Sequence, residues 1–178
     1  NIRCIMCPNQ SLSSHQTGHM PIERFQKIVD DIGPYVNNIS ICHRGEPLLH
    51  KGLCEMIEYC SGRGLNTSIH TNAVLLTEDL SHRLIRSGLS AISFSFDGYT
   101  KKAYESIRVG SKFEAVLTNI RQFLRIKREM KSKSPHTTIQ IIEFESFREA
   151  QDVEQKQKFI QLFDGLPVDR IYVKRAHN

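Results

Sequence analysis

Short runs rich in β-branched residues alternate with longer amphipathic stretches along most of this sequence, and this alternation limits the possible folds. The strand-like runs are residues 36–42, 67–71, 91–96, 137–144 and 171–174. The stretches with helical spacing are residues 21–32, 49–61, 77–87, 100–130 with a break near Gly110, and 148–163. Strands that alternate with helices form parallel sheets with right-handed crossovers. We therefore predict an α/β fold with a parallel sheet, in one domain.

The composition is that of an ordinary globular protein. The chain has 178 residues and a net charge of +5, and no apolar run approaches the roughly 20 residues of a membrane span. Its five cysteines are odd in number and lack the pattern of a secreted disulfide scaffold. We therefore expect a cytoplasmic protein with no membrane partner. The basic stretch at residues 121–133 is interpreted as a solvated helix end, so no nucleic-acid partner is expected.

A pair of cysteines, Cys4 and Cys7, lies near the start of the sequence in a C-x2-C arrangement. Such a pair by itself fits a zinc site, a redox site or an iron–sulfur site. Pro8 follows directly, so the pair is expected in a loop and not at the start of a helix, where redox pairs usually lie. A zinc ribbon needs a second ligand pair, but the remaining cysteines are interpreted as buried apolar residues: Cys42, Cys54 and Cys60.

The segment Asn-Ile-Arg-Cys-Ile-Met-Cys-Pro at residues 1–8 resembles the cysteine loop of the radical SAM superfamily, whose pattern is C-x3-C-x2-C. The resemblance implies that a first cysteine and a first strand lie upstream of Asn1. Cys4 and Cys7 would then hold, together with that cysteine, three irons of a [4Fe–4S] cluster. The fourth iron would bind the amino and carboxylate groups of S-adenosylmethionine (SAM), and Met6 would approach the adenine through its backbone.

Three further motifs, each at the end of a predicted strand, resemble the same superfamily. Residues 43–47 resemble its GGEP motif, with Arg44 in place of the first glycine. The resemblance implies that the backbone of Gly45 binds the SAM amino group and that Glu46 fixes the loop. Residues 71–73 resemble a TNG turn with Ala73 in place of glycine, so Asn72 either contacts SAM or only shapes the turn. For residues 43–47, the structural alternative is an ordinary turn.

The third motif is Ser93–Gly98 followed by Tyr104–Arg108, which resembles the fourth-strand signature S-x-D-G with a following Y-x-x-I-R. The resemblance implies that Ser95 and Arg108 bind the methionine carboxylate of SAM. A hydroxyl and a guanidinium are natural partners of a carboxylate. The structural alternatives are a small residue that faces a helix for Ser95 and a surface cation for Arg108.

The resemblance covers the whole chain and implies a fold. The expected architecture is a partial (β/α)6 TIM-like barrel of the radical SAM type, with the first strand missing from this segment. Residues 1–178 would form the single, incomplete core domain, truncated at both ends. The Cys-x-Met-Cys-Pro sequence resembles the SPASM/twitch branch, as do Gly18–Met20, Gln140, Phe159 and the ending Asp169–Asn178. In that branch a C-terminal domain with auxiliary clusters follows, and we expect it to be absent here.

The function implied is reductive cleavage of SAM to a 5′-deoxyadenosyl radical, which takes a hydrogen atom from the substrate. The substrate is expected to be a small molecule or a peptide that is oxidised or modified, with flavodoxin or ferredoxin as electron donor. The resemblance assigns no further catalytic residue, although Glu143, Glu145, Lys174 and Arg175 are candidates to face the substrate. The alternative hypothesis is a non-catalytic α/β domain that binds metal, either a pseudo-enzyme or a zinc protein.

Overall fold

A computed structural model of the protein describes residues 1–12, 17–143 and 153–175. Its centre is a five-stranded sheet in the order β2-β3-β4-β6-β7, and every neighbouring pair in it is parallel. The strands are β2 (Asn38–Ser40), β3 (Asn66–Thr71), β4 (Ala91–Ser95), β6 (His136–Glu143) and β7 (Arg170–Arg175). The predicted α/β fold is confirmed, and the sheet is open, with β2 and β7 as its two edge strands.

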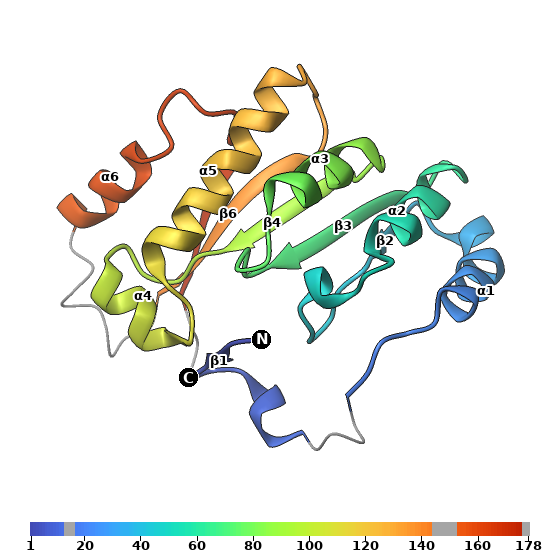
Figure 1. The fold of residues 1–178 in the computed structure, drawn as a ribbon, viewed down its shortest axis with the longest axis horizontal. Coiled ribbons are helices and arrows are strands. Elements are labelled where there is room, and N and C mark those ends of the chain that lie inside the picture. The colour runs from blue at the N-terminus through green and yellow to red at the C-terminus, as the bar shows by residue number, and fades with distance from the viewer. Residues whose placement is uncertain (13–16, 144–152, 176–178) are drawn as a thin grey trace.

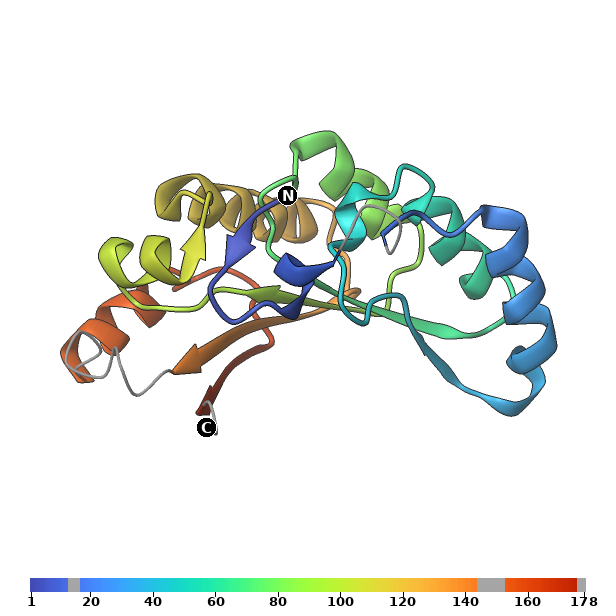
Figure 2. The ribbon, with the colours of Figure 1, turned by 90° about the horizontal axis from the view of Figure 1, so that it is seen from below.

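Helices connect successive strands and cover one face of the sheet. They are α1 (Ile22–Ile32), α2 (Leu53–Ser61), α3 (Glu78–Arg86), α4 (Lys101–Ile107), α5 (Phe113–Glu129) and α6 (Val153–Gln161). Short 3-10 turns lie at Pro8–Ser11, Gly33–Tyr35 and Pro47–Leu49. Figure 2 shows α2, α3 and α5 above the sheet, while no helix of the described residues lies below it. None of the described helices is long and apolar enough to cross a membrane.

The two faces of the sheet differ in chemistry because side chains alternate along a strand. Ile69, Phe94 and Ile139 are almost completely buried in the main hydrophobic core under the helices. There the ring of Phe94 meets that of Phe123 from α5, with the two centroids 5.4 Å apart. The opposite face carries the alternate positions of the same strands, which are mostly polar: Ser68, His70, Ser93, Ser95, Thr138, Gln140, Tyr172 and Lys174.

A two-stranded ribbon outside the main sheet was not predicted. β1 (Arg3–Cys4) pairs antiparallel with β5 (Arg108–Val109), and Cys4 lies opposite Arg108 in the register. The break between α4 and α5 falls where it was predicted, at Gly110, which has a φ of 90°. The ribbon fixes the N-terminal segment beyond the strand ends of the main sheet, where it appears in blue below the arrowheads of β3 and β4 (Figure 1).

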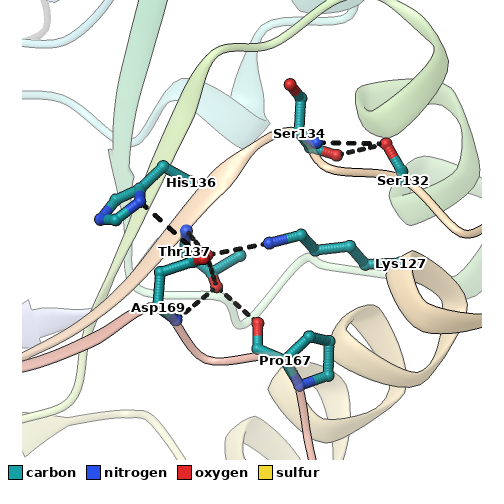
Figure 3. Close-up of polar contacts among 7 residues, drawn as sticks. All are labelled: Lys127, Ser132, Ser134, His136, Thr137, Pro167 and Asp169. Carbon is teal, nitrogen blue, oxygen red and sulfur yellow. Dashed lines mark hydrogen bonds and ion pairs between the residues drawn. The ribbon is translucent and has the colours of Figure 1, made fainter.

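A cluster of polar side chains links helix α5 to the amino-terminal edge of the sheet (Figure 3). The Lys127 ammonium of α5 donates to Oδ2 of Asp169 at 2.9 Å. The backbone N–H and the hydroxyl of Thr137 each donate to the same oxygen at 2.7 Å. Because Thr137 lies in β6 and Asp169 directly precedes β7, these contacts tie α5 to the starts of two strands.

The predicted elements are found in the predicted order, with differences at their ends. The strand predicted at residues 36–42 is limited to Asn38–Ser40, and the helix predicted at 49–61 begins at Leu53 because a 3-10 turn occupies Pro47–Leu49. Residues 148–152 of the last predicted helix lie outside the described residues, as does Glu145. Cys54 and Cys60 are buried as predicted, whereas Cys42 is only half-buried and its thiol faces the carbonyl of Gly45 at 3.5 Å.

Candidate functional site

The residues singled out in the sequence lie at the carboxyl ends of the parallel strands, together with the ribbon that carries Cys4. Gly45 and Glu46 follow β2, Asn72 follows β3, and Ser95 ends β4. Carboxyl ends of parallel strands lie at one edge of a sheet, where α/β proteins bind their ligands. The described contacts join these segments in turn: Glu46 to the end of β3, Asn72 to the N-terminal segment, and Asp97 to the ribbon.

The cysteine turn is held on the ribbon by backbone hydrogen bonds. The N–H of Ile5 donates to the carbonyl of Ile107 at 3.0 Å, and the N–H of Cys7 donates to the carbonyl of Cys4 at 3.0 Å. Cys4 is 9% exposed, whereas Met6 and Cys7 are half-buried. Burial raises the pKa of the Cys4 thiol, and the nearby guanidinium of Arg108 opposes this effect. The turn therefore presents two sulfur atoms, one buried beside a cation and one partly accessible.

Arg108 is a buried residue and not the surface cation of the structural alternative. Its Nε and Nη2 donate to Oδ2 of Asp97 at 2.9 and 2.6 Å, and Asp97 is completely buried. Its Nη1 faces the Sγ of Cys4 at 3.8 Å. The guanidinium therefore lies between the end of β4 and the cysteine turn. Sequence reasoning singled out both Ser95–Asp97 and Arg108, but it did not identify Asp97 as the partner of the guanidinium.

Glu46 joins the loop after β2 to the end of β3. Its Oε1 accepts hydrogen bonds from the backbone of Leu48 at 3.1 Å and from the hydroxyl of Thr71 at 2.7 Å. Its Oε2 accepts from the backbone N–H of Asn72 at 2.9 Å. Beside it, Gly45 is exposed, and a Cβ added there would meet no atom within 4 Å. The loop is thus fixed by a carboxylate, and the backbone at Gly45 is exposed beside it.

Asn72 shapes the turn after β3 and also contacts the N-terminal segment. Its Oδ1 accepts from the backbone N–H of Val74 at 3.0 Å, and its Nδ2 donates to Oδ1 of Asn1 at 3.0 Å. Ala73 follows in a left-handed conformation with a φ of 57°. This conformation favours glycine, which is the residue of the TNG pattern at this position. The side chain of Asn72 therefore has a definite structural role in the turn.

Ser95 lies half-buried at the end of β4, opposite Gln140 of β6 in the register. Ser93, two positions earlier on the same face, is 8% exposed, and its hydroxyl has no hydrogen-bond partner in the part of the chain that the structure describes. Buried hydroxyls are normally paired. Among the described residues, the Ser93 hydroxyl is therefore an unpaired polar group beneath this face of the sheet.

The thiols of Cys4 and Cys7 fit the ligands of an iron–sulfur cluster better than those of a complete single-metal site. Over residues 1–12, 17–143 and 153–175, no three or more His, Cys, Asp or Glu side chains gather in a way that could hold a metal ion. The two thiols of one short turn are soft donors of the kind that bind iron–sulfur clusters. The N–H that Arg108 directs to Cys4 suits a sulfur that carries negative charge in a cluster.

Comparison with known proteins agrees with this geometry. Residues 1–152 match the family model described as Radical SAM superfamily. The AdoMet-dependent heme synthase of Methanosarcina barkeri is 28% identical over 121 residues, which cover 67% of this chain and 35% of that protein. The tungsten-containing aldehyde ferredoxin oxidoreductase cofactor-modifying protein of Pyrococcus furiosus is 27% identical over 145 residues, which cover 80% and 40%.

The fold is also found among solved structures. Streptococcus suis SuiB bound to S-adenosylmethionine aligns with a TM-score of 0.79 and 17% identity, over 100% of this chain and 38% of that one. The same protein bound to its precursor peptide SuiA aligns with a TM-score of 0.77. Membership of the matched family implies a [4Fe–4S] cluster and SAM as cofactors. From the family match over residues 1–152 and the arrangement of the site, the chain belongs to the radical SAM superfamily.

Proposed function

We propose that this protein cleaves SAM reductively to methionine and a 5′-deoxyadenosyl radical, and that this radical abstracts a hydrogen atom from the substrate. The observation that carries the proposal is the contact of Arg108 with Cys4, which joins the cysteine turn to the end of β4. The chain spans about 35–40% of the length of the two curated relatives above. The activity of the whole protein is therefore stated here as a proposal.

Each site residue has a role in this proposal. Cys4 and Cys7 ligate the cluster, which supplies one electron to SAM when it is bound and reduced. The backbone of Met6 lies against the adenine, and the backbone of Gly45 binds the amino group of SAM. Three polar side chains complete the site: Asn72, Ser95 and Arg108.

Two features support the roles of the polar side chains. The carboxylate of Glu46 already holds the Gly45 loop against β3, so the backbone that would bind the amino group is ordered in advance. Nε and Nη2 of Arg108 donate to Asp97, so the guanidinium would approach the methionine carboxylate with its Nη1 side. Ser95 would bind that carboxylate from the end of β4.

We further propose a substrate that is a peptide or a polar small molecule, and membership of the SPASM/twitch branch. SuiB, which shares the fold, was solved with its precursor peptide. The face of the sheet opposite the helices presents hydroxyl, amide and imidazole groups, among them His70, Thr138 and Gln140 in neighbouring strands. Such groups hydrogen-bond peptide amides or sugar-like hydroxyls. Lys174, which is exposed on β7, extends this face toward the carboxyl edge.

Glu143 has a defined partner at the carboxyl end of β6. Its Oε1 accepts the phenolic hydrogen of Tyr99 at 2.7 Å, and Lys156 lies 3.9 Å away. Burial and the nearby Glu143 carboxylate raise the pKa of Tyr99, which stays a phenol and a donor at physiological pH. Glu143 is therefore proposed to border the substrate region and not to extend freely into it.

A flavodoxin or ferredoxin in a cytoplasmic setting is the proposed electron source.

Anaerobic reconstitution with iron and sulfide tests the proposed function. In the full-length protein, which is proposed to supply the upstream cysteine, we expect about four irons per chain and formation of 5′-deoxyadenosine that requires both SAM and a reductant. Cys4→Ala and Cys7→Ala should abolish iron binding, whereas Cys54→Ala is the matched control, because Cys54 is buried in α2 away from the turn. Zinc without iron would support the non-catalytic zinc domain, and iron without SAM cleavage would support a pseudo-enzyme; either result would contradict the proposal.

A further inference from the structure

Asp97 connects three parts of the structure that come from distant parts of the sequence. It directly follows the motif residue Phe96 at the end of β4 and is completely buried. Its Oδ1 accepts the backbone N–H of Ile142 in β6 at 2.9 Å, while its Oδ2 accepts both Nε and Nη2 of Arg108. The carboxylate is therefore held by the sheet on one side and holds the guanidinium on the other.

The geometry of this ion pair determines which way the rest of the guanidinium points. A guanidinium is planar, and its N–H groups diverge in fixed directions. Because Nε and Nη2 are both used by Asp97, Nη1 is directed to the opposite side, where it faces the Sγ of Cys4 at 3.8 Å. The Arg108 side chain is only 9% exposed, so water screens the contact weakly.

We propose that Asp97 is a positioning residue, which holds Arg108 so that an N–H of Nη1 donates to the sulfur of Cys4 and thereby raises the reduction potential of the cluster. The inference rests on the proposed function, because it requires Cys4 to be a cluster ligand. Hydrogen bonds to ligand sulfurs and nearby charges both set the potentials of iron–sulfur clusters. An N–H donor and a positive charge stabilise the reduced state, which carries one more negative charge.

The substitution Asp97→Asn separates positioning from simple electrostatics by the sign of the effect. If Asp97 acted only as a nearby negative charge, its removal would raise the cluster potential. If it positions Arg108, asparagine cannot serve both sides of this contact: its one acceptor oxygen can face either the guanidinium or the N–H of Ile142, and its NH2 group then opposes a donor on the other side. The N–H is then withdrawn from Cys4, and the potential falls.

The test is potentiometric titration of the reconstituted protein, followed by electron paramagnetic resonance of the reduced cluster. We expect Asp97→Asn and Arg108→Gln each to lower the midpoint potential and to change the resonance signal at full iron content. The double variant should be no lower than Arg108→Gln alone, because both changes remove one interaction. Arg125→Gln, which removes a positive charge from an exposed position on α5, should leave the potential unchanged.

A potential that rises or stays constant in Asp97→Asn would overturn the inference. If that variant does not fold, Arg108→Lys replaces it: lysine keeps the charge but has a single nitrogen and no fork. Positioning predicts a lower potential for Arg108→Lys, whereas an unchanged potential would overturn it. A wild-type protein that binds no iron would overturn the proposed function and this inference with it. A wild-type protein that cleaves SAM, with variants of unchanged potential, would overturn this inference alone.

Discussion

Glu46 illustrates at the scale of one residue why the loop after β2 needs a carboxylate. All three groups that it contacts are donors: the N–H of Leu48, the hydroxyl of Thr71 and the N–H of Asn72. An ionised carboxylate has only acceptors, so both of its oxygens match this environment. The side chain thereby fixes one loop to another, although the two lie about 25 residues apart in the chain.

We predict that Glu46→Gln lowers the free energy of unfolding by about 2 kcal/mol, the range for loss of a hydrogen bond to a charged group. The reason is that glutamine replaces one acceptor oxygen by an NH2 group, which then faces an N–H or O–H donor of the surrounding loop and cannot accept from it. The same variant should bind SAM more weakly, because the Gly45 loop loses its support. Urea unfolding and isothermal titration with SAM measure the two effects. The exposed Glu58→Gln on α2 serves as the control, and equal effects in both variants would contradict the role of Glu46.

Arg108 shows how far residue patterns predict a site. The sequence predicted its place near the cofactor, because the motif Y-x-x-I-R has a recognisable spacing after β4. It could not predict the contacts, since the partners Asp97 and Cys4 are 11 and 104 residues away. Neither separation leaves a periodic signal. The role of Arg108 toward SAM stays a prediction, while its burial between Asp97 and Cys4 is a result of the structure.

At the scale of elements, the strands and helices were predicted well where they are long and periodic. Buried runs such as Ile92, Phe94 and Phe96 alternate with serines, and this period of two is visible in the sequence. The ribbon of β1 and β5 was missed, because each strand has two residues and no period can appear in two. The start of α2 was placed too early because the apolar Leu48 and Leu49 belong to a preceding turn.

Gly98 permits the sharp turn between β4 and α4, and it gives a prediction at this scale. Its φ is +101°, and a Cβ there would lie 2.8 Å from the backbone nitrogen of Tyr104. We expect Gly98→Ala to lower the free energy of unfolding by about 3 kcal/mol, from backbone strain together with overpacking against α4. Chemical denaturation monitored by circular dichroism measures the change.

Gly64→Ala is the matched control for this substitution. Gly64 also has a positive φ, of +73°, but a Cβ there would meet nothing within 4 Å. Its substitution should therefore cost only the backbone term, about 1 kcal/mol. If the two variants lost equal stability, the contact with α4 would not be the cause.

At the scale of the whole molecule, the two edges of the sheet have different tasks. The carboxyl edge carries the residues of the proposed cofactor site. The amino edge carries the cluster of Lys127, Thr137 and Asp169, in which Lys127 is almost completely buried and ion-paired (Figure 3). A buried lysine without a partner would be costly. Stability and ligand binding can therefore be perturbed separately in this fold.

Asp169 should make stability depend on pH. Burial raises the pKa of its carboxyl group, but the hydrogen bonds from Lys127 and Thr137 outweigh burial and lower the pKa from 3.8 to about 2. A carboxyl group with a lowered pKa in the folded state stabilises the fold above its unfolded pKa and loses this effect as the pH falls. The stabilisation should thus be complete above about pH 4 to 5 and disappear toward about pH 2. About a third of the side chain is exposed, which weakens the effect.

The measurement is the free energy of unfolding in urea across this pH range. Asp169→Asn should be less stable than the wild type near neutral pH, and the difference should shrink as the pH falls. Asp164→Asn, at an exposed position nearby, should behave as the wild type. A constant difference between Asp169→Asn and the wild type at all pH values would contradict this assignment.

The ribbon of β1 and β5 has a consequence for the order of folding. It brings Cys4 against a residue 104 positions later in the chain, so the first turn acquires its support only after a long loop has closed. Contacts of such high sequence separation form slowly. A nascent chain that exposes Cys4 and Cys7 therefore has no finished site until β4 and α4 have also been synthesised and packed. We therefore expect iron–sulfur assembly on this protein to follow the packing of β4 and α4 and not to precede it.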